Sequence, residues 1–199
     1  MEFRQTDGRM QRRERTQARV VEAHTELLRS GVLRPTAAQI AERAGVSTRT
    51  LWANFHDMEN LLQNTVAYWF SSDDALRGEI DADLPLDERI EQFCSERARR
   101  LDNIAPAARS AVLAEPWSPT LRNSRWGHLE RVRDDISRVF RAEIAADDDP
   151  DLLVDALLMA TSWNAWSLSR DDLGHDADRA REVMARAVRA LLRLDEGEV

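Results

Sequence analysis

Apolar residues recur at three- and four-residue intervals along nearly the whole chain, and no stretch sustains the alternating pattern of a strand. Prolines and glycines fall mainly between these amphipathic segments, where helices begin and end. The pattern therefore predicts an all-α protein. Residues 1–11 have no apolar stripe and are expected to form a polar arm, with the first helix over about 12–30.

Three polar residues stand where they can cap the helices that follow. Thr36 and Gln39 have the spacing of a capping box, in which each side chain accepts a hydrogen bond from the other residue's backbone. Ser47 and Asp57 each precede an apolar-periodic stretch and can accept from a free backbone N–H in its first turn. The expected helices span 37–44, 48–55 and 57–70.

Beyond residue 71 the sequence predicts long amphipathic helices separated by acidic or proline-containing breaks. The last two are expected over 150–170 and 177–194, each with one strongly apolar face. Two such stripes would expose a large apolar patch on a single chain, so we expect them to pair with their copies in a homodimer. The alternative is that both stripes are buried within the monomer.

The most informative motif is the stretch 36–62, TAAQIAERAGVSTRTLWANFHDMENLL. Its two short helices meet at Gly45, which can adopt the left-handed backbone conformation of a tight turn. Ala41, four residues earlier, is small enough for the second helix to pack across the first. This is the pattern of a helix-turn-helix, whose second helix enters the major groove of DNA with its N-terminal residues leading.

Residues 12–62 resemble the DNA-binding region of TetR-type repressors. The resemblance rests on IAERAGVS at 40–47, on Thr50 and Leu51 followed by an aromatic residue, and on Phe55 followed by an acidic and apolar run. It implies an N-terminal three-helix helix-turn-helix DNA-binding domain over 1–56, joined by helix 57–70 to a C-terminal helical ligand-binding and dimerisation domain over 71–199. That second part resembles the family in architecture only.

The resemblance also implies roles for single residues. Thr36 would contact phosphate, and Trp52, where the family usually has tyrosine, would pack on the sugar–phosphate backbone. Asn54 replaces the usual histidine and can still donate to phosphate, whereas Met58 replaces a lysine and loses one contact. Independently of the family, Arg49 can bond O6 and N7 of guanine. The expected DNA-binding residues are Thr36, Ser47, Thr48, Arg49, Thr50, Trp52, Asn54, Arg12 and Arg13.

Charge is divided unevenly along the chain. Residues 1–56 hold ten arginines and six acidic residues, a net charge of +4, whereas residues 57–199 carry −12. A basic end on an acidic body favours contact between the N-terminal segment and a polyanion. The arginine cluster from Arg4 to Arg19 is expected to contact phosphates or the minor groove, with a solvated tail as the alternative.

Five of the six tryptophans follow the segment expected to read DNA. Such a set suits a cavity for a flat or bulky apolar ligand, while ordinary core packing is the alternative. Trp163 and Trp166 are three residues apart and can share a helix face, in a cavity or in the dimer interface. The expected ligand-binding residues are Phe93, Leu101, Trp117, Trp126, Met159, Trp163 and Trp166.

Other classes of function find little support in the sequence. No apolar run approaches the roughly 18 residues of a membrane span, and no signal peptide is indicated, so a cytoplasmic protein is expected. The single Cys94 excludes an internal disulfide, and no metal site or cofactor is predicted. No catalytic motif is present, so no enzyme is predicted, although an unrecognised helical enzyme stays open.

The sequence thus predicts a homodimeric repressor that binds a double-stranded DNA operator and is released by a small hydrophobic or aromatic effector. The alternative is a helical small-molecule-binding module with weakened or no DNA binding.

Overall fold

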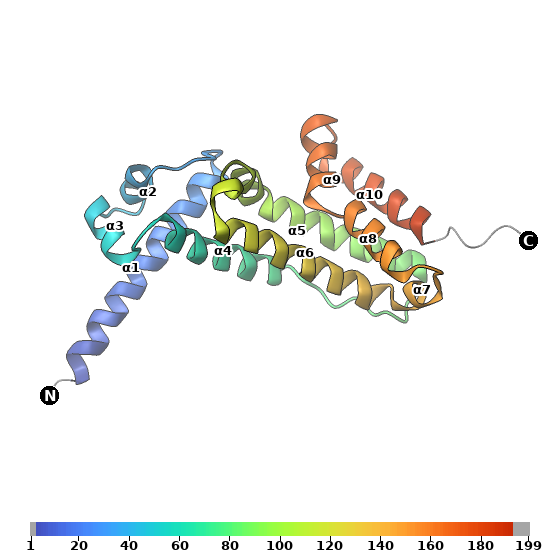
Figure 1. The fold of residues 1–199 in the computed structure, drawn as a ribbon, viewed down its shortest axis with the longest axis horizontal. Coiled ribbons are helices and arrows are strands. Elements are labelled where there is room, and N and C mark those ends of the chain that lie inside the picture. The colour runs from blue at the N-terminus through green and yellow to red at the C-terminus, as the bar shows by residue number, and fades with distance from the viewer. Residues whose placement is uncertain (1–2, 193–199) are drawn as a thin grey trace, which may run out of the picture. The chain divides into compact units, whose positions relative to one another are not determined.

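The computed structural model describes residues 3–192, with the side chains of residue 8 and of residues 10–192. This part of the chain contains helices and no strand (Figure 1), which confirms the predicted all-α class. Within it, no helix combines the length and the apolar character needed to cross a bilayer. The helices are α1 (Phe3–Arg29), α2 (Ala37–Arg43), α3 (Thr48–Asn54), α4 (Met58–Asp74), α5 (Leu86–Ala114), α6 (Pro119–Val139), α7 (Arg141–Ala146), α8 (Pro150–Ala160), α9 (Trp163–Ser167) and α10 (Ala177–Leu191), with a 3-10 turn over Glu115–Trp117 and a π-helical turn over Leu168–Asp172.

The chain packs as two compact units. The first comprises Met1–Ser72 and Pro106–Ser124, and the second comprises Asp73–Ala105 and Arg125–Val199. Residues 106–124 therefore pack with the first unit, whereas the sequence analysis assigned them to the C-terminal domain. Only the last two residues of α4 belong to the second unit. The functional division at helix 57–70 stays a prediction.

The core of the first unit lies between α1 and the two short helices, which both pack on α1. Val20 and Leu27 on the second half of α1 are buried, as their spacing predicts. Ile40 of α2, Leu51 of α3 and Phe55 are fully buried against them. Burying each of these side chains contributes about 1.5–3 kcal/mol, so a small core can hold two helices of seven residues each.

The helix caps predicted from the sequence are confirmed. The Thr36 hydroxyl accepts from the backbone N–H of Gln39 at 3.3 Å, and Gln39 Oε1 accepts from the backbone N–H of Thr36 at 2.9 Å. This reciprocal pair is the capping box of α2. Ser47 caps α3, and the carboxylate of Asp57 caps α4 in the same way. Each cap satisfies a backbone donor that the first helical turn leaves without a partner.

The first helix begins earlier than predicted. It extends from Phe3, whereas the sequence analysis expected a polar arm as far as residue 11. This segment has no apolar face to pack on a core, but it still has high helix propensity. Arginine, glutamine and methionine are good helix formers, and no proline interrupts them. Local bonds support the helix further along, where Thr16 Oγ1 donates to the Arg12 carbonyl at 2.9 Å.

The second unit is built around one apolar core. Here α8 packs against α7, α9 and α10, and apolar side chains of α5 and α6 complete the core. One fully buried residue from each of four helices shows how evenly the core is shared. These residues are Leu101 of α5, Ile136 of α6, Leu157 of α8 and Val188 of α10.

The helix expected over 150–170 is broken. α8 ends at Ala160, α9 begins at Trp163, and a π-helical turn follows. Thr161 Oγ1 donates back to the Leu157 carbonyl at 2.8 Å, and Ser162 accepts from the backbone N–H of Ala165 at 3.2 Å. Serine and threonine hydroxyls compete with helical hydrogen bonds, so two in succession end one helix and cap the next. The expected end of the last helix, at residue 194, lies outside the described residues.

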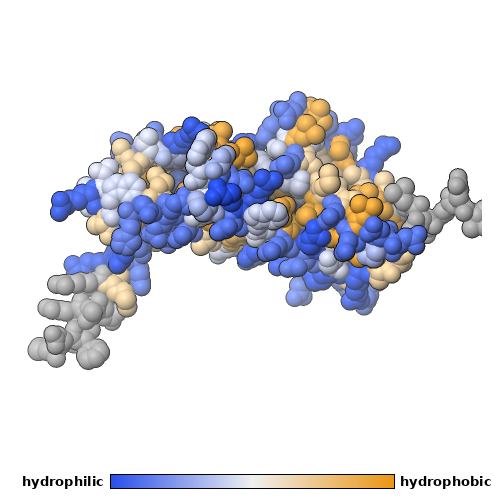
Figure 2. Space-filling view, in the orientation of Figure 1, coloured by the Kyte–Doolittle hydropathy of each residue, from blue (hydrophilic) through white to orange (hydrophobic). Residues whose placement is uncertain are grey.

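The apolar stripes of α8 and α10 divide between core and surface. The predicted row with Leu153 and Leu157 is buried within the chain. A second row remains outside, with Leu152 64% and Met159 74% exposed on α8 and Val183 42% exposed on α10. Figure 2 shows apolar surface over α8 on the visible face. Among residues 3–192, these exposed side chains of the two helices therefore have no apolar partner that buries them.

A buried ionic cluster lies in the second unit. Arg100 donates to both carboxylate oxygens of Asp73, at 3.0 and 2.6 Å, and to Asp135 at 2.9 Å and Glu96 at 3.1 Å. Burial acts to lower the pKa of Arg100, but the hydrogen bonds that it donates to Asp73 and Asp135 raise it. The sequence analysis did not single out these residues. Removing one partner of such a buried pair costs about 3–5 kcal/mol, because the other charge is left uncompensated.

A buried histidine joins α1 to α4 in the first unit. His24 Nδ1 lies 2.9 Å from the hydroxyl oxygen of Thr65, and His24 is 4% exposed. Burial lowers the pKa of His24 from 6.5 to about 4. The unfolded chain therefore takes up a proton below pH 6.5, while the folded chain does so only near pH 4. Stability from this site is complete above pH 6.5 and is lost as the pH falls to 4.

We predict that His24→Gln makes the protein less sensitive to acid over this range. Glutamine keeps a polar group beside Thr65 but does not titrate. The wild type should lose about 3 kcal/mol more than the variant between pH 7 and pH 4, measured by urea unfolding at each pH. Equal losses in the two proteins would show that His24 does not carry this pH dependence.

Candidate nucleic-acid interface

The turn between α2 and α3 depends on Gly45. Its φ of 63° lies in the left-handed region that favours glycine. The backbone N–H of Val46 donates to the Ala41 carbonyl at 2.9 Å, and that of Gly45 donates to the Glu42 carbonyl at 3.0 Å. These two bonds form a Schellman motif, which satisfies carbonyls at the end of α2. The turn fixes the direction in which the chain enters α3.

Arg19 on α1 belongs to the same turn. Its Nη2 donates to the carbonyl oxygen of Ala44, at the C-terminal end of α2, where the helix dipole favours a cation. A Cβ on residue 45 would approach this nitrogen to 2.9 Å, so a larger residue there would require the end of the Arg19 side chain to shift. Arg19 is therefore engaged in holding α1 and the turn together.

The first turn of α3 presents its side chains outward. Thr48 and Arg49 are exposed, while Leu51 is fully buried and anchors the helix on the core. Thr50 is half-buried, with its hydroxyl 2.9 Å from that of Ser47. No carboxylate in the described part of the chain pairs with Arg49. The residues expected to read bases thus lie together on the accessible side of a firmly seated helix.

Trp52 and Asn54 follow on the same helix. Trp52 is half-buried and packs against the core of the first unit, so part of its ring stays at the surface. The side-chain Nδ2 of Asn54 donates to the backbone carbonyl of Thr50 at 2.8 Å. The backbone carbonyl of Asn54 accepts from Nε2 of Gln17 at 3.1 Å. The Asn54 amide is therefore partly used within α3, which reduces what it can offer to a phosphate.

The expected phosphate contacts lie on two helices. Arg12 and Arg13 are exposed on α1, and Arg12 Nε donates to the Gly8 carbonyl at 3.1 Å. Thr36 is exposed at the start of α2, although its hydroxyl serves the capping box. The side chains of Arg4 and Arg9 lie outside the described residues.

Four of the seven residues expected to bind a ligand lie in or against the core of the second unit. Phe93, Leu101 and Trp166 are buried, and Trp163 packs against them half-buried. Trp166 Nε1 donates to Asp102 at 3.1 Å, so the polar edge of its indole is satisfied within the protein. Their arrangement is that of core side chains, the alternative left open above.

The other three residues of that set are at the surface. Trp117 is 78% exposed in the first unit, while Trp126 and Met159 are 67% and 74% exposed in the second. Side chains that face water do not wall an enclosed cavity within a single chain. They are instead available to a partner that covers them.

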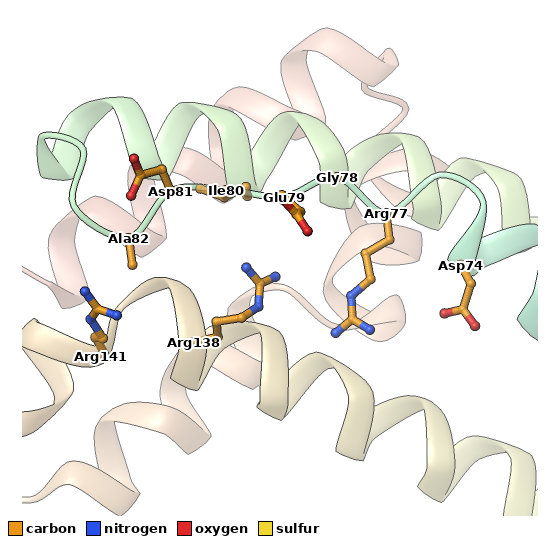
Figure 3. A pocket seen from close by; sticks show the side chains of 9 residues that line it. All are labelled: Asp74, Arg77, Gly78, Glu79, Ile80, Asp81, Ala82, Arg138 and Arg141. Carbon is orange, nitrogen blue, oxygen red and sulfur yellow. The ribbon is translucent and has the colours of Figure 1, made fainter.

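A groove of about 880 Å³ in the second unit is lined by none of the seven (Figure 3). Figure 3 shows Arg77 and Arg138 reaching into the space between the segment after α4 and the end of α6. Both donate to Asp135, and Arg141 pairs with Asp83, so all three arginines are already paired with carboxylates of the protein. The lining offers little to a flat apolar ligand. It consists of Asp74, Arg77, Gly78, Glu79, Ile80, Asp81, Ala82, Arg138 and Arg141.

A buried polar pair in the second unit was missed by the sequence analysis. Arg97 on α5 is 3% exposed, donates from Nε to the Thr161 carbonyl at 2.9 Å, and places Nη2 3.1 Å from His128 Nε2. Burial, with a contribution from Arg97, lowers the pKa of His128 to about 3, so this histidine is neutral and accepts the bond. The one available signal was periodicity, because position 97 lies four residues from both Phe93 and Leu101.

No protein-family model matches the chain, and no curated protein sequence matches it.

Proposed function

We propose that the protein is a TetR-type transcriptional regulator, a homodimer that binds double-stranded DNA and is released by a small-molecule effector. The observation that carries this proposal is the first turn of α3, where Thr48 and Arg49 are exposed above the fully buried Leu51. Two capped helices joined by a glycine turn, with the second exposing its leading residues, have the form of a helix-turn-helix.

The chemistry of the exposed residues supports base reading and backbone contact. Arg49 has the fork of donors that matches guanine in the major groove, and a threonine methyl can pack on that of thymine. Arg12 and Arg13 on α1 carry guanidinium groups suited to phosphates or to the minor groove. The net charge of +4 over residues 1–56 favours the same partner.

The exposed row on α8 and α10 supports a homodimer. Leu152, Ala156 and Met159 are spaced to share one side of α8, and α8 packs beside α10, which exposes Val183. A second copy of the chain would cover this row, and two recognition helices could then occupy two half-sites of an operator.

The path from effector to DNA runs through α4 in this proposal. Asp73, near the end of α4, is held by Arg100 in the second unit. Earlier residues of α4 belong to the first unit, where Leu61 is fully buried and Thr65 bonds to His24. An effector that shifts the charge cluster would thus move α4 and the helices packed with it. Linkage requires that operator DNA weaken effector binding by the same factor.

A helical small-molecule-binding module without DNA binding is the second candidate. Two observations favour it: Met58 is exposed where the resembling family has a lysine, and the Asn54 amide is partly used by α3. Both reduce the number of phosphate contacts. Binding to duplex DNA, with its dependence on salt, distinguishes the two candidates.

We predict that Arg49→Ala weakens binding to the preferred duplex by about 1–3 kcal/mol and relaxes preference at one base position. Selection from random duplexes and titration at fixed salt measure both effects. The matched control is Arg43→Ala, which removes the same charge from an α2 residue paired with Glu26 at 3.3 Å. Unchanged affinity and preference in Arg49→Ala would exclude base reading by this residue.

We also predict that replacing both Arg12 and Arg13 by alanine weakens binding to all duplexes alike. If each arginine neutralises one phosphate, the slope of log K against log salt should fall by about 2. A double variant of the exposed Arg99 and Arg141 removes the same charge from the second unit and should keep the slope. If the double variant of Arg12 and Arg13 has the same salt slope as the wild type, these two arginines do not contact DNA phosphates.

A third prediction concerns the dimer. Met159→Asp places a carboxylate in the exposed row and should raise the dimer dissociation constant at least about tenfold, because burying an unpaired charge is costly. Operator affinity should fall with it. Val112→Asp, at a 59% exposed apolar position of the first unit, is the control. Sedimentation velocity gives the answer, and an intact Met159→Asp dimer would place the interface elsewhere.

A further inference from the structure

Two arginines one turn apart on α5 are both buried, and their hydrogen bonds differ. Arg100 donates to three carboxylates, as described above. Arg97 has no carboxylate among its hydrogen-bond partners, which are the Thr161 carbonyl and the neutral His128. Its third nitrogen, Nη1, is buried and has no hydrogen-bond partner among the described residues.

A guanidinium in this state is poorly solvated by the protein. Arginine carries five N–H donors and no acceptor, and a buried donor without an acceptor has lost water and gained nothing in return. The buried charge adds a second unfavourable contribution, since no carboxylate bonds to it directly. An acceptor with a negative charge would bond to the unpaired N–H donor and would also compensate the buried positive charge. A carboxylate has the geometry that matches a guanidinium group.

The electrostatic surroundings point the same way. Burial and, next, the charge of Arg100 lower the pKa of Arg97 to about 10, although Asp73, Asp135 and Glu96 act to raise it. The pKa of His128 is lowered by burial and then by Arg97. Burial is the largest of these causes and disfavours charge of either sign, whereas the repulsion between neighbouring cationic groups is the part that a bound anion would offset.

The pair also lies among apolar groups. Arg97 is flanked on its side of α5 by the buried Phe93 and Leu101. Thr161, which accepts its Nε bond, stands at the break between α8 and α9, two residues before the half-buried Trp163. We propose that Arg97 and His128 anchor a site in the second unit for a small carboxylate with an apolar body.

A regulatory role for this carboxylate rests on the function proposed above, whereas its binding does not. Arg97 precedes Arg100 by three residues on the same helix, and Arg100 holds Asp73 at the end of α4. A carboxylate bound to Arg97 changes the electrostatic field at the Arg100 cluster. It can therefore alter the interaction of Arg100 with Asp73 and, through it, the position of α4.

The test uses the full chain without DNA and sodium benzoate as the probe, with acetate as a smaller carboxylate and chloride to match ionic strength. Calorimetric titration should show benzoate binding, and benzamide, of the same shape but uncharged, should bind roughly 10- to 100-fold more weakly. Arg97→Met should lose this preference. Arg99→Met, two residues away and exposed, should keep it.

The proposal is overturned if neither benzoate nor acetate binds the wild type, or if benzoate and benzamide bind alike. It is also overturned if Arg97→Met folds and keeps the preference for benzoate. If Arg97→Met fails to fold, His128→Gln takes its place. The comparison of benzoate with benzamide on the wild type still decides whether the protein binds a carboxylate in preference to a neutral amide. In a second experiment, benzoate is added to the protein bound to duplex DNA. If benzoate binds through Arg97 but does not release the duplex, the binding site is supported and its regulatory role is contradicted.

Discussion

The guanidinium of Arg100 is the group on which the second unit most depends. It brings together carboxylates from three helices, Asp73 of α4, Glu96 of α5 and Asp135 of α6, in a place that water barely reaches. Without the arginine, Asp73 and Glu96 would lose the guanidinium they pair with, whereas Asp135 would keep Arg77 and Arg138. Because α4 contributes one of these carboxylates, the same interaction holds the end of that helix in the second unit.

The first unit is organised on a different principle, in which a small apolar core holds short helices at defined angles. Leu51 and Phe55 seat α3, the Gly45 turn sets its direction, and Arg19 ties the turn to α1. The backbone from which the exposed Thr48 and Arg49 project thus receives a fixed position. A surface that must recognise another molecule benefits from such rigidity, because little conformational entropy is lost on binding.

The features predicted correctly from the sequence are those encoded within a few residues. The caps at Thr36, Ser47 and Asp57 and the turn at Gly45 each depend on one side chain and its near neighbours. The buried charges were missed because Arg97, Arg99 and Arg100 look alike in sequence, and only packing decides that the middle one faces water. The exposure of the tryptophans could not be predicted for a similar reason: Trp117 follows a proline in a break, where helical periodicity says nothing about burial. The ligand-binding role of the set stays a prediction.

The hydrogen bonds between Asp73 and Arg100 have a consequence for how the chain opens. A helix end normally frays, and its amides exchange with solvent in brief local openings. The end of α4 frays less readily, because separating Asp73 from Arg100 would leave the buried guanidinium with fewer carboxylates. Amide exchange in the last turn of α4 should therefore be slower than at a helix end that lacks such a bond. That turn would then unfold cooperatively with the second unit, although most of α4 is packed with the first.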